Sequence, residues 1–366
     1  MSEKRSIPNK VFLAINIIAV LLLFCCYLAG IINPIKFWPI AFFSLLYPTI
    51  LLINIGFITL WIAKGNKEFL ISLIAILIGW NTFHANFNLN FEEIPDDAKK
   101  IKVLTYNVKN FDLYNWKKGA ETKEKIFEFL EAQNADILCF QEYFHSTHHK
   151  GFETNAELKK LLKAKDIHTF FTETHKRGDN WGMAIYSKYP IIKKQDIRFK
   201  GLKHNTCIMA DIVIRKDTIR VINVHLASIG LGDKTTNFNK INDKDWKEED
   251  LDIALSISKK LKNAFQKRGE QVDKIAQLIK NSPYPVLVCG DFNDTPSSYS
   301  YKKLAEGLSD AFIESGNGFG NTYNGNYPSF RIDYILHDSK FKTFNFKTHK
   351  KDLSDHYAIS CLLQLN

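Results

Sequence analysis

Long apolar runs near the amino terminus constrain this 366-residue chain more than any other feature. The first run, VFLAINIIAVLLLFCCYLAGII, covers residues 11–32 and contains no charged side chain. A helix of this length can cross the roughly 30 Å hydrocarbon layer of a bilayer. Further apolar runs at 38–63 and 69–87 follow closely. The sequence therefore predicts an all-α membrane anchor of about three transmembrane helices within residues 1–90.

Two of these runs have an alternative interpretation. Basic residues precede the first run, as in a cleaved signal peptide, but no small-x-small cleavage site follows it and further apolar runs do. The third run reaches spanning length only by including Asn81, His84 and Asn86. A re-entrant or interfacial segment is therefore the alternative for the third run.

The basic residues that flank the runs predict the orientation of the anchor. Lysine and arginine are concentrated before the first run and between the second and third, at Lys4, Arg5, Lys10, Lys64 and Lys67. The loop after the first run carries only Lys36. Cytoplasmic loops are enriched in lysine and arginine. We therefore expect a multi-pass protein of the cell membrane with its remaining domain outside the cytoplasm, and the reverse if the third run does not span.

The rest of the chain is mildly basic. The formal net charge is +10, of which residues 1–90 carry +4 and the remainder +6. Such a charge suits an anionic substrate or lipid surface, and it equally suits an ordinary lysine-rich solvated surface. Residues 91–100 form a polar linker broken by Pro95, and residues 229–256 form a charged insertion. That insertion is either a substrate-facing lid or a solvated loop.

Residues 101–366 alternate strand-like and helix-like segments. Apolar runs such as IKVLTYNV, ADILCFQE, IRVINVHL and PVLVCG are separated by helical patterns near 121–132 and up to about residue 280. This pattern predicts an α/β (α+β) layered sandwich in which two mixed β-sheets are flanked by helices.

Acids, amides and histidines follow or open these apolar runs. They are Asn107, Glu142, His225, Asp291, Asn293, Asp333, Asp355 and His356. Side chains at strand ends project from a rigid scaffold into a shared crevice, where functional sites are common. In an extended backbone Asp291 and Asn293 would point to the same side. Asn107, Asn293 or Asp355 could instead be simple turn residues.

The segments around these residues resemble a known superfamily. The pieces TYNVKNF, CFQEY, INVHLAS, GDFND, RIDYIL and SDH are similar to the motifs of the endonuclease/exonuclease/phosphatase (deoxyribonuclease-I-like) superfamily. That superfamily includes nucleases, neutral sphingomyelinases and inositol-polyphosphate phosphatases. The resemblance covers residues 101–365 and implies the layered sandwich and phosphate-ester hydrolysis.

The resemblance also implies a role for each site residue. Glu142 would be the main ligand of Mg²⁺, with Mn²⁺ as a substitute, beside Asn107 and Asp355. Oxygen ligands of this kind suit hard divalent cations. The residues that the resemblance places in catalysis are His225, Asp291, Asn293, Asp333 and His356. Arg177 and Asn293 are candidates for contact with the substrate phosphate, though Arg177 could simply pair with a neighbouring carboxylate.

We therefore expect a membrane-anchored, Mg²⁺-dependent phosphoesterase, of the phosphodiesterase or nuclease type. A sphingomyelinase-like lipid phosphodiesterase is one alternative, and a catalytically silent binding or scaffold protein on the same fold is another. The expected partners are a phosphate-ester substrate, nucleic acid or phospholipid, and the lipid bilayer. The sequence predicts no obligate protein partner.

Overall fold

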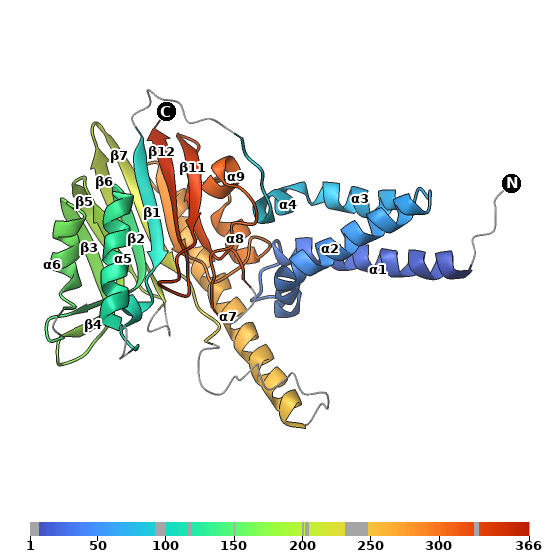
Figure 1. Ribbon diagram of the computed structural model, residues 1–366, viewed down its shortest axis with the longest axis horizontal. Helices are drawn as coiled ribbons and strands as arrows, with labels where there is room; N and C mark the ends of the chain where they lie inside the picture. Colours follow the sequence, from blue (N-terminus) through green and yellow to red (C-terminus); the bar gives the residue numbers. More distant parts are fainter. Residues whose placement is uncertain are drawn as a thin grey trace.

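The protein is described by a computed structural model over residues 7–91, 100–115, 119–149, 151–199, 201, 205–230, 248–325 and 329–365. Most of the predicted linker and residues 231–247 of the predicted insertion lie outside these ranges. Within them, an amino-terminal group of helices is joined to a larger α/β unit (Figure 1).

The amino-terminal helices carry the apolar runs. They are α1 (Ile7–Ala29), η1 (Trp38–Ala41), α2 (Phe42–Ala63), α3 (Phe69–Ile78) and α4 (Trp80–Asn86). Two stretches, Asn9–Ala29 and Trp38–Ala63, are long and apolar enough to cross a membrane. A third crossing requires that α3 and α4, which meet at an angle of 77°, form one broken span.

A buried polar network joins α1, α2 and α3. The Asn16 amide donates to the Ser72 hydroxyl at 2.6 Å, and the Ser72 hydroxyl donates to Asn54 at 2.9 Å. The Trp61 indole donates to Asn16 at 3.0 Å. In an apolar bundle, such bonds favour one rotational setting of each helix over others.

Two six-stranded sheets form the α/β unit. The first has the order β11-β12-β1-β2-β4-β3 and the second β5-β6-β7-β8-β10-β9. The strands of the first are β1 (Ile101–Asn107), β2 (Ile137–Ser146), β3 (Asp166–Thr174), β4 (Asp179–Ser187), β11 (Phe341–His349) and β12 (Ala358–Leu365). Those of the second are β5 (Ile191–Ile197), β6 (Thr206–Ile214), β7 (Asp217–His225), β8 (Val286–Asp291), β9 (Ser309–Asp310) and β10 (Asp333–His337). Both sheets are mixed, because β1 and β2 are parallel, as are β7 and β8, whereas β12 is antiparallel to β1 and β10 to β8.

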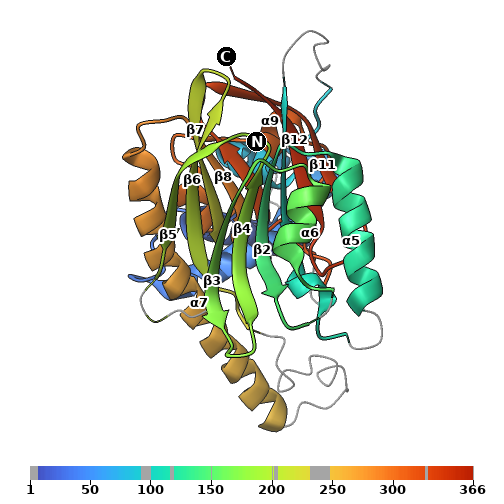
Figure 2. The ribbon, with the colours of Figure 1, turned by 90° about the vertical axis from the view of Figure 1, so that its left-hand side faces the viewer.

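Each central strand buries both of its faces. In β1, Val103 faces the opposite sheet while Leu104 faces the outer helices, because successive side chains alternate. Helices α5 (Gly119–Gln133) and α6 (Thr154–Leu161) cover the first sheet, and α7 (Glu248–Lys280) and α8 (Tyr299–Leu304) cover the second (Figure 2). The short elements η2 (Lys109–Asp112) and α9 (Ala311–Ser315) complete the unit. The predicted layered sandwich is confirmed.

One part of the sequence prediction is wrong. Residues 248–256 were assigned to the charged insertion, but they form the first turns of α7. Their acidic side chains misled the prediction, because acids are common in the first turns of exposed helices.

The amino-terminal helices are joined to the α/β unit by buried polar contacts. The fully buried Arg331 donates to the carbonyl oxygen of Ala85 at 2.7 Å and pairs with Asp310 at 2.8 Å. The amide of Asn33 donates to Asp273 at 2.9 Å, and the Thr295 hydroxyl donates to the Ser44 carbonyl at 3.1 Å. These contacts hold the α/β unit against the carboxyl-terminal ends of α1 and α4 and the amino-terminal end of α2.

Candidate active site

The site lies at one edge of the sandwich, where the side chains that point from each sheet toward the other change from apolar to polar. In β1 these side chains run from Val103 through Thr105 to Asn107, and in β7 from Val221 through Asn223 to His225. The same register leads through β8 to Asp291 and places Asp333 opposite it at the start of β10. Apolar side chains fill the depth of the sandwich and polar ones its edge.

A bulge in β2 brings Glu142 to this edge. The apolar run ILCFQE predicts a strand that ends at Glu142, but β2 continues to Ser146. Pairing between β2 and β4 shifts register between Phe140 and Tyr143, and Glu142 has a φ of 48°. Without the bulge, Gln141 and Glu142 would point to opposite faces of the sheet. A left-handed conformation at a non-glycine residue is strained, which is common at functional sites.

A turn, and not an extended strand, joins Asp291 to Asn293. Strand β8 ends at Asp291, and Asn293 has a φ of 52°. The expectation that both side chains share one side of an extended backbone is therefore wrong. The turn instead folds Asn293 back, so that its backbone N–H donates to Asp291 at 2.8 Å and its amide donates to the same carboxylate at 3.1 Å.

Asn107 connects the two carboxylates that face it. Its amide nitrogen lies 3.2 Å from Oε1 of Glu142 and 3.1 Å from Oδ2 of Asp291. Nε2 of His225 lies 3.8 Å from Glu142 and 3.7 Å from Asp291. Side chains from β1, β2, β7 and β8 thus meet at one point.

His356 enters the same site from the turn before β12. Its Nδ1 lies 2.9 Å from Oδ2 of Asp333, and its Nε2 lies 3.7 Å from Oδ2 of Asp291. Burial alone would lower the pKa of His356, but the negative charges of Asp333 and Asp291 outweigh it and raise the pKa to about 10. The imidazole therefore carries a positive charge at neutral pH.

The two acids that face the histidines hold their protons more tightly than free carboxyl groups. Burial raises the pKa of Asp291 to about 6, although the charge of His356 opposes the shift. Burial also raises the pKa of Glu142, again against the charge of His356. About a third of the Glu142 side chain is exposed, compared with 1% for Asp291, so Glu142 is the more accessible carboxylate.

Asp355 lies next to the site, whereas Arg177 lies in a turn of the same sheet. Asp355 pairs with Lys109 at 3.4 Å, and both charges act on Glu142, Asp355 raising its pKa and Lys109 lowering it. Arg177 is an exposed residue of the turn between β3 and β4, at the end of the sheet where β2 terminates. Contact of Arg177 with a substrate stays a prediction.

The loop after β1 adopts an unusual backbone. Four consecutive residues, from Lys109 to Asp112, have φ values between 46° and 58°. A left-handed turn of this kind is costly for L-residues, and the fully buried Phe111 holds it in place. The turn brings Lys109 beside Asp355.

A family comparison identifies this domain. A model of the Endonuclease/Exonuclease/phosphatase family matches residues 104–356, a segment that contains every residue placed at the site above. The chain belongs to the endonuclease/exonuclease/phosphatase family. Members of this family are hydrolases that act on phosphoester bonds and typically depend on divalent metal ions. Residues 9–86 match a second model, a domain of unknown function (DUF8431).

Solved structures share the family fold. An endonuclease/exonuclease/phosphatase from Beutenbergia cavernae is 15% identical, with a TM-score of 0.52 over 73% of this chain and 72% of that one. A family protein from Bacteroides thetaiotaomicron is 16% identical, with a TM-score of 0.52 over 74% of this chain and 99% of that one. At these identities the likeness is one of fold. No curated protein matches this chain.

Sequence reasoning missed the polar residues beneath the family's site. Gln141 donates to Asn223 at 2.6 Å, and Asn223 donates to the carbonyl oxygens of Phe140 and Ala184 at 2.9 and 3.0 Å. These bonds join β2 to β7 across the sandwich, directly under Glu142 and His225. The available signal was a polar residue inside an apolar run, one position before Glu142 and two before His225.

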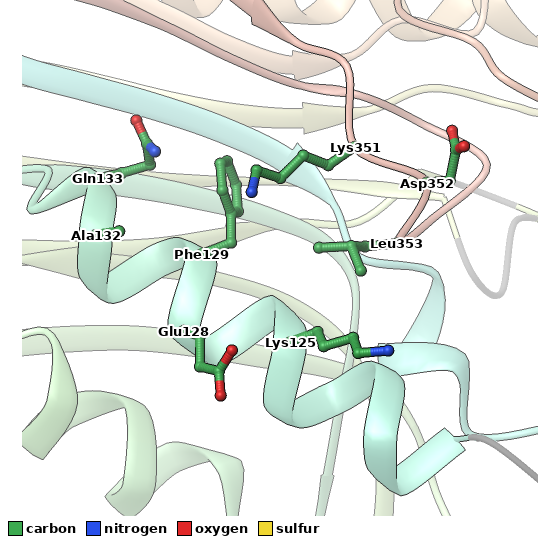
Figure 3. A pocket seen from close by; sticks show the side chains of 8 residues that line it. All are labelled: Lys125, Glu128, Phe129, Ala132, Gln133, Lys351, Asp352 and Leu353. Atoms are coloured by element: carbon green, nitrogen blue, oxygen red, sulfur yellow. The ribbon is translucent and has the colours of Figure 1, made fainter.

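A shallow groove elsewhere on the domain has no part in this site. It has a volume of about 430 Å³ and lies between α5 and the loop before β12, where Phe129 and Leu353 face lysine and acidic side chains (Figure 3). Its lining residues are Lys125, Glu128, Phe129, Ala132, Gln133, Lys351, Asp352 and Leu353. Opposite charges are mixed along its walls, so it offers no selective site for an anion.

Proposed function

We propose that this chain is a membrane-anchored, divalent-metal-dependent phosphodiesterase that hydrolyses nucleic acid or another phosphodiester by in-line attack of water. The observation that carries the proposal is the convergence of Asn107, Glu142, His225, Asp291 and His356 on one point from separate elements. Residues 1–90 would form the anchor, 91–100 the linker and 101–366 the catalytic domain.

The residues present fit a hard divalent cation. Glu142 offers a partly exposed carboxylate, and Asp355 lies near enough to influence its pKa. The Asn107 amide turns its nitrogen toward Glu142 and its oxygen toward the backbone N–H of Lys109, so it would offer its oxygen to a cation only after the amide flips. Carboxylate and amide oxygens are the ligands that Mg²⁺ and Mn²⁺ accept. When bound, the cation would neutralise charge on the phosphoryl oxygens. Asp291, Asp333 and His356 also lie within 4.8 Å of one another, but His356 and Asp333 already bond to each other.

The buried carboxylate supports the role of general base. Asp291 is held by two bonds from Asn293 and one from Asn107, which fix its orientation. Its pKa of about 6 lies close to neutrality. A base whose pKa is near the working pH combines the deprotonated state with a useful proton affinity. We assign to Asp291 the orientation and deprotonation of the attacking water.

The histidines support stabilisation of the transition state. His356 stays protonated because Asp333 holds Nδ1, which leaves Nε2 to donate to a phosphoryl oxygen. His225 also lies 3.7 Å from Asp291 and would donate to the phosphate or the leaving group. Asn293 and Arg177 would contact the phosphate.

The arrangement of the helices supports extracytoplasmic catalysis. Lys64 donates to Asn9 at 3.2 Å, so the start of α1 and the connection between α2 and α3 lie together, at the end of the bundle away from the catalytic domain (Figure 1). Basic residues mark the cytoplasmic side. Protease accessibility of the catalytic domain in intact cells tests this sidedness.

The activity is tested with the full chain in nanodiscs. Bis-(p-nitrophenyl) phosphate, plasmid DNA, RNA and sphingomyelin would each be offered with Mg²⁺, with Mn²⁺ and with EDTA. We expect metal-dependent cleavage of phosphodiesters, abolished by EDTA and by Asp291→Ala. Cleavage of sphingomyelin alone would identify a lipid phosphodiesterase, and cleavage of nothing a binding protein. An Asp291→Ala variant with the wild-type rate would reject the assigned roles.

A further inference from the structure

The contact between α7 and the amino-terminal helices follows one stripe of the long helix. Toward the carboxyl-terminal end of this stripe, α7 packs closely on the segment after α1. A Cβ added at Gly269 would lie 3.1 Å from Asn33 and 3.2 Å from Pro34. The Phe265 ring packs on Phe42 with centroids 5.4 Å apart. The ammonium of Lys262 lies 5.1 Å from the centre of the Trp38 ring.

The stripe continues beyond Lys262 toward the amino-terminal end of α7. Leu251, Leu255, Ser258, Lys262, Phe265 and Gly269 succeed one another at steps of three or four residues, so they lie on one face of α7. Leu251 is 58% exposed and Leu255 is 60% exposed. An exposed leucine is ordinary on its own, but these two are consecutive members of the stripe that contacts the amino-terminal helices. In Figure 1 this part of α7 extends beyond the sheets and leans toward the side on which the amino-terminal helices lie.

The neighbouring surface is apolar as well. The connection between α1 and η1 exposes Ile31, Ile35 and Phe37, which are 71%, 43% and 53% exposed. This connection ends one candidate span and begins the next, so it marks one boundary of the proposed membrane anchor. Aromatic side chains such as Trp38 are enriched at that depth.

We propose that the amino-terminal half of α7 lies on the bilayer as an interfacial helix, with Leu251 and Leu255 inserted among the lipid headgroups. The proposal rests on the membrane anchor proposed above and is independent of the catalytic assignment. We choose lipid as the partner of this face because the face is continuous. The face of α7 that carries both leucines also contacts the segment at the boundary of the proposed anchor. By sequence, residues 248–262 hold four acids and three lysines, a net charge of −1, so the contact depends on apolar burial and not on anionic lipid.

The test compares two neighbouring exposed positions. Leu255→Cys and Ser256→Cys would each be labelled with a polarity-sensitive dye in the full chain, carrying Cys25→Ser, in phosphatidylcholine vesicles. Ser256 is exposed but lies on another face of α7. We expect a nitroxide attached to lipid to quench the Leu255→Cys label at least threefold more than the Ser256→Cys label. Iodide in the water should show the opposite preference.

Other outcomes would overturn the proposal. Equally weak quenching of both labels by the lipid nitroxide, with equally strong quenching by iodide, would place the helix in water. Protection of the Leu255→Cys label from both quenchers would mean that protein covers the face. Cross-linking between two Leu255→Cys chains would identify a second copy as its partner. Flotation with the vesicles separates these results from failure of the anchor itself, and hydrolysis of bis-(p-nitrophenyl) phosphate separately reports on the catalytic site.

Discussion

At the scale of single residues, the pair of His356 and Asp333 determines the charge of the site. Both side chains are buried, and their 2.9 Å contact helps to raise the pKa of His356 to about 10, so the imidazole next to Asp291 is positively charged at neutral pH. The sequence predicted that these residues share a site, because each opens or follows an apolar run. It could not predict that Asp291, at 3.7 Å, also acts on His356, since that proximity arises from strand pairing.

Asp333→Asn should lower the activity about 10²-fold, the lower end of what one proton-donating group contributes, with a larger loss at high pH. The amide keeps the shape but removes the charge that raises the pKa of His356, so the imidazole loses its proton at a lower pH. Rates with bis-(p-nitrophenyl) phosphate over a pH series measure this shift. As a matched control, Asp338→Asn removes a carboxylate from the other end of β10 and should leave the pH profile unchanged.

The pH profile of the unaltered protein should show a plateau between two losses. Asp291 must be deprotonated to act as a base, so activity should fall as the pH drops through about 6. His356 must be protonated to donate, so activity should fall again as the pH rises through about 10. The dependence of kcat/KM on pH reports both groups in the free enzyme. Full activity well below pH 6 would contradict the role of Asp291.

At the scale of elements, the close approach of β7 and β8 sets the spacing between His225 and Asp291. The two strands are parallel and in register at these residues. Gly290 has a φ of 137°, and a Cβ there would lie 2.0 Å from the carbonyl oxygen of Val224. The sequence predicted both strands and the turn after them. It could not predict the bulge at Glu142 or the left-handed turn after β1, because strain of this kind is held by packing from distant segments.

Gly290→Ala should destabilise the catalytic domain by at least about 2 kcal/mol, because the new methyl group must push the two strands apart. Thermal unfolding of the full chain in detergent measures the loss. Gly307→Ala is the matched control. Gly307 also has a positive φ, of 77°, but has open space around it, so only the backbone strain of about 1 kcal/mol should appear. Equal losses would show that the contact with Val224 is not the cause.

At the scale of the whole molecule, the proposed anchor and the catalytic domain form a joint unit. The length of the apolar runs predicted the anchor, the alternation of strand-like and helix-like segments predicted the α/β domain, and the polar stretch between them predicted a linker. It could not predict the contacts of Asn33, Thr295 and Arg331, because each joins segments more than 200 positions apart in the chain.

A fragment that begins at residue 96 should therefore be less stable than the same domain in the full chain. It would lose the partner of Arg331 at Ala85 and expose Phe265, which is 2% exposed in the structure. The unfolding temperatures of the two forms are compared in the same detergent, and gel filtration compares their tendency to aggregate. Phe265→Gln in the fragment should reduce its aggregation. A monomeric fragment with an unchanged unfolding temperature would show that the contacts are dispensable.

The buried contact between Arg331 and Ala85 has a consequence for the membrane-anchored enzyme proposed above. A catalytic domain on a long flexible linker can reach substrates throughout the volume around its attachment point, even when the anchor does not move. A catalytic domain held directly against its helices has no such freedom. In the membrane-anchored arrangement proposed above, its encounters with a substrate would be set by lateral diffusion of the entire protein and by the substrate that comes close to the membrane surface.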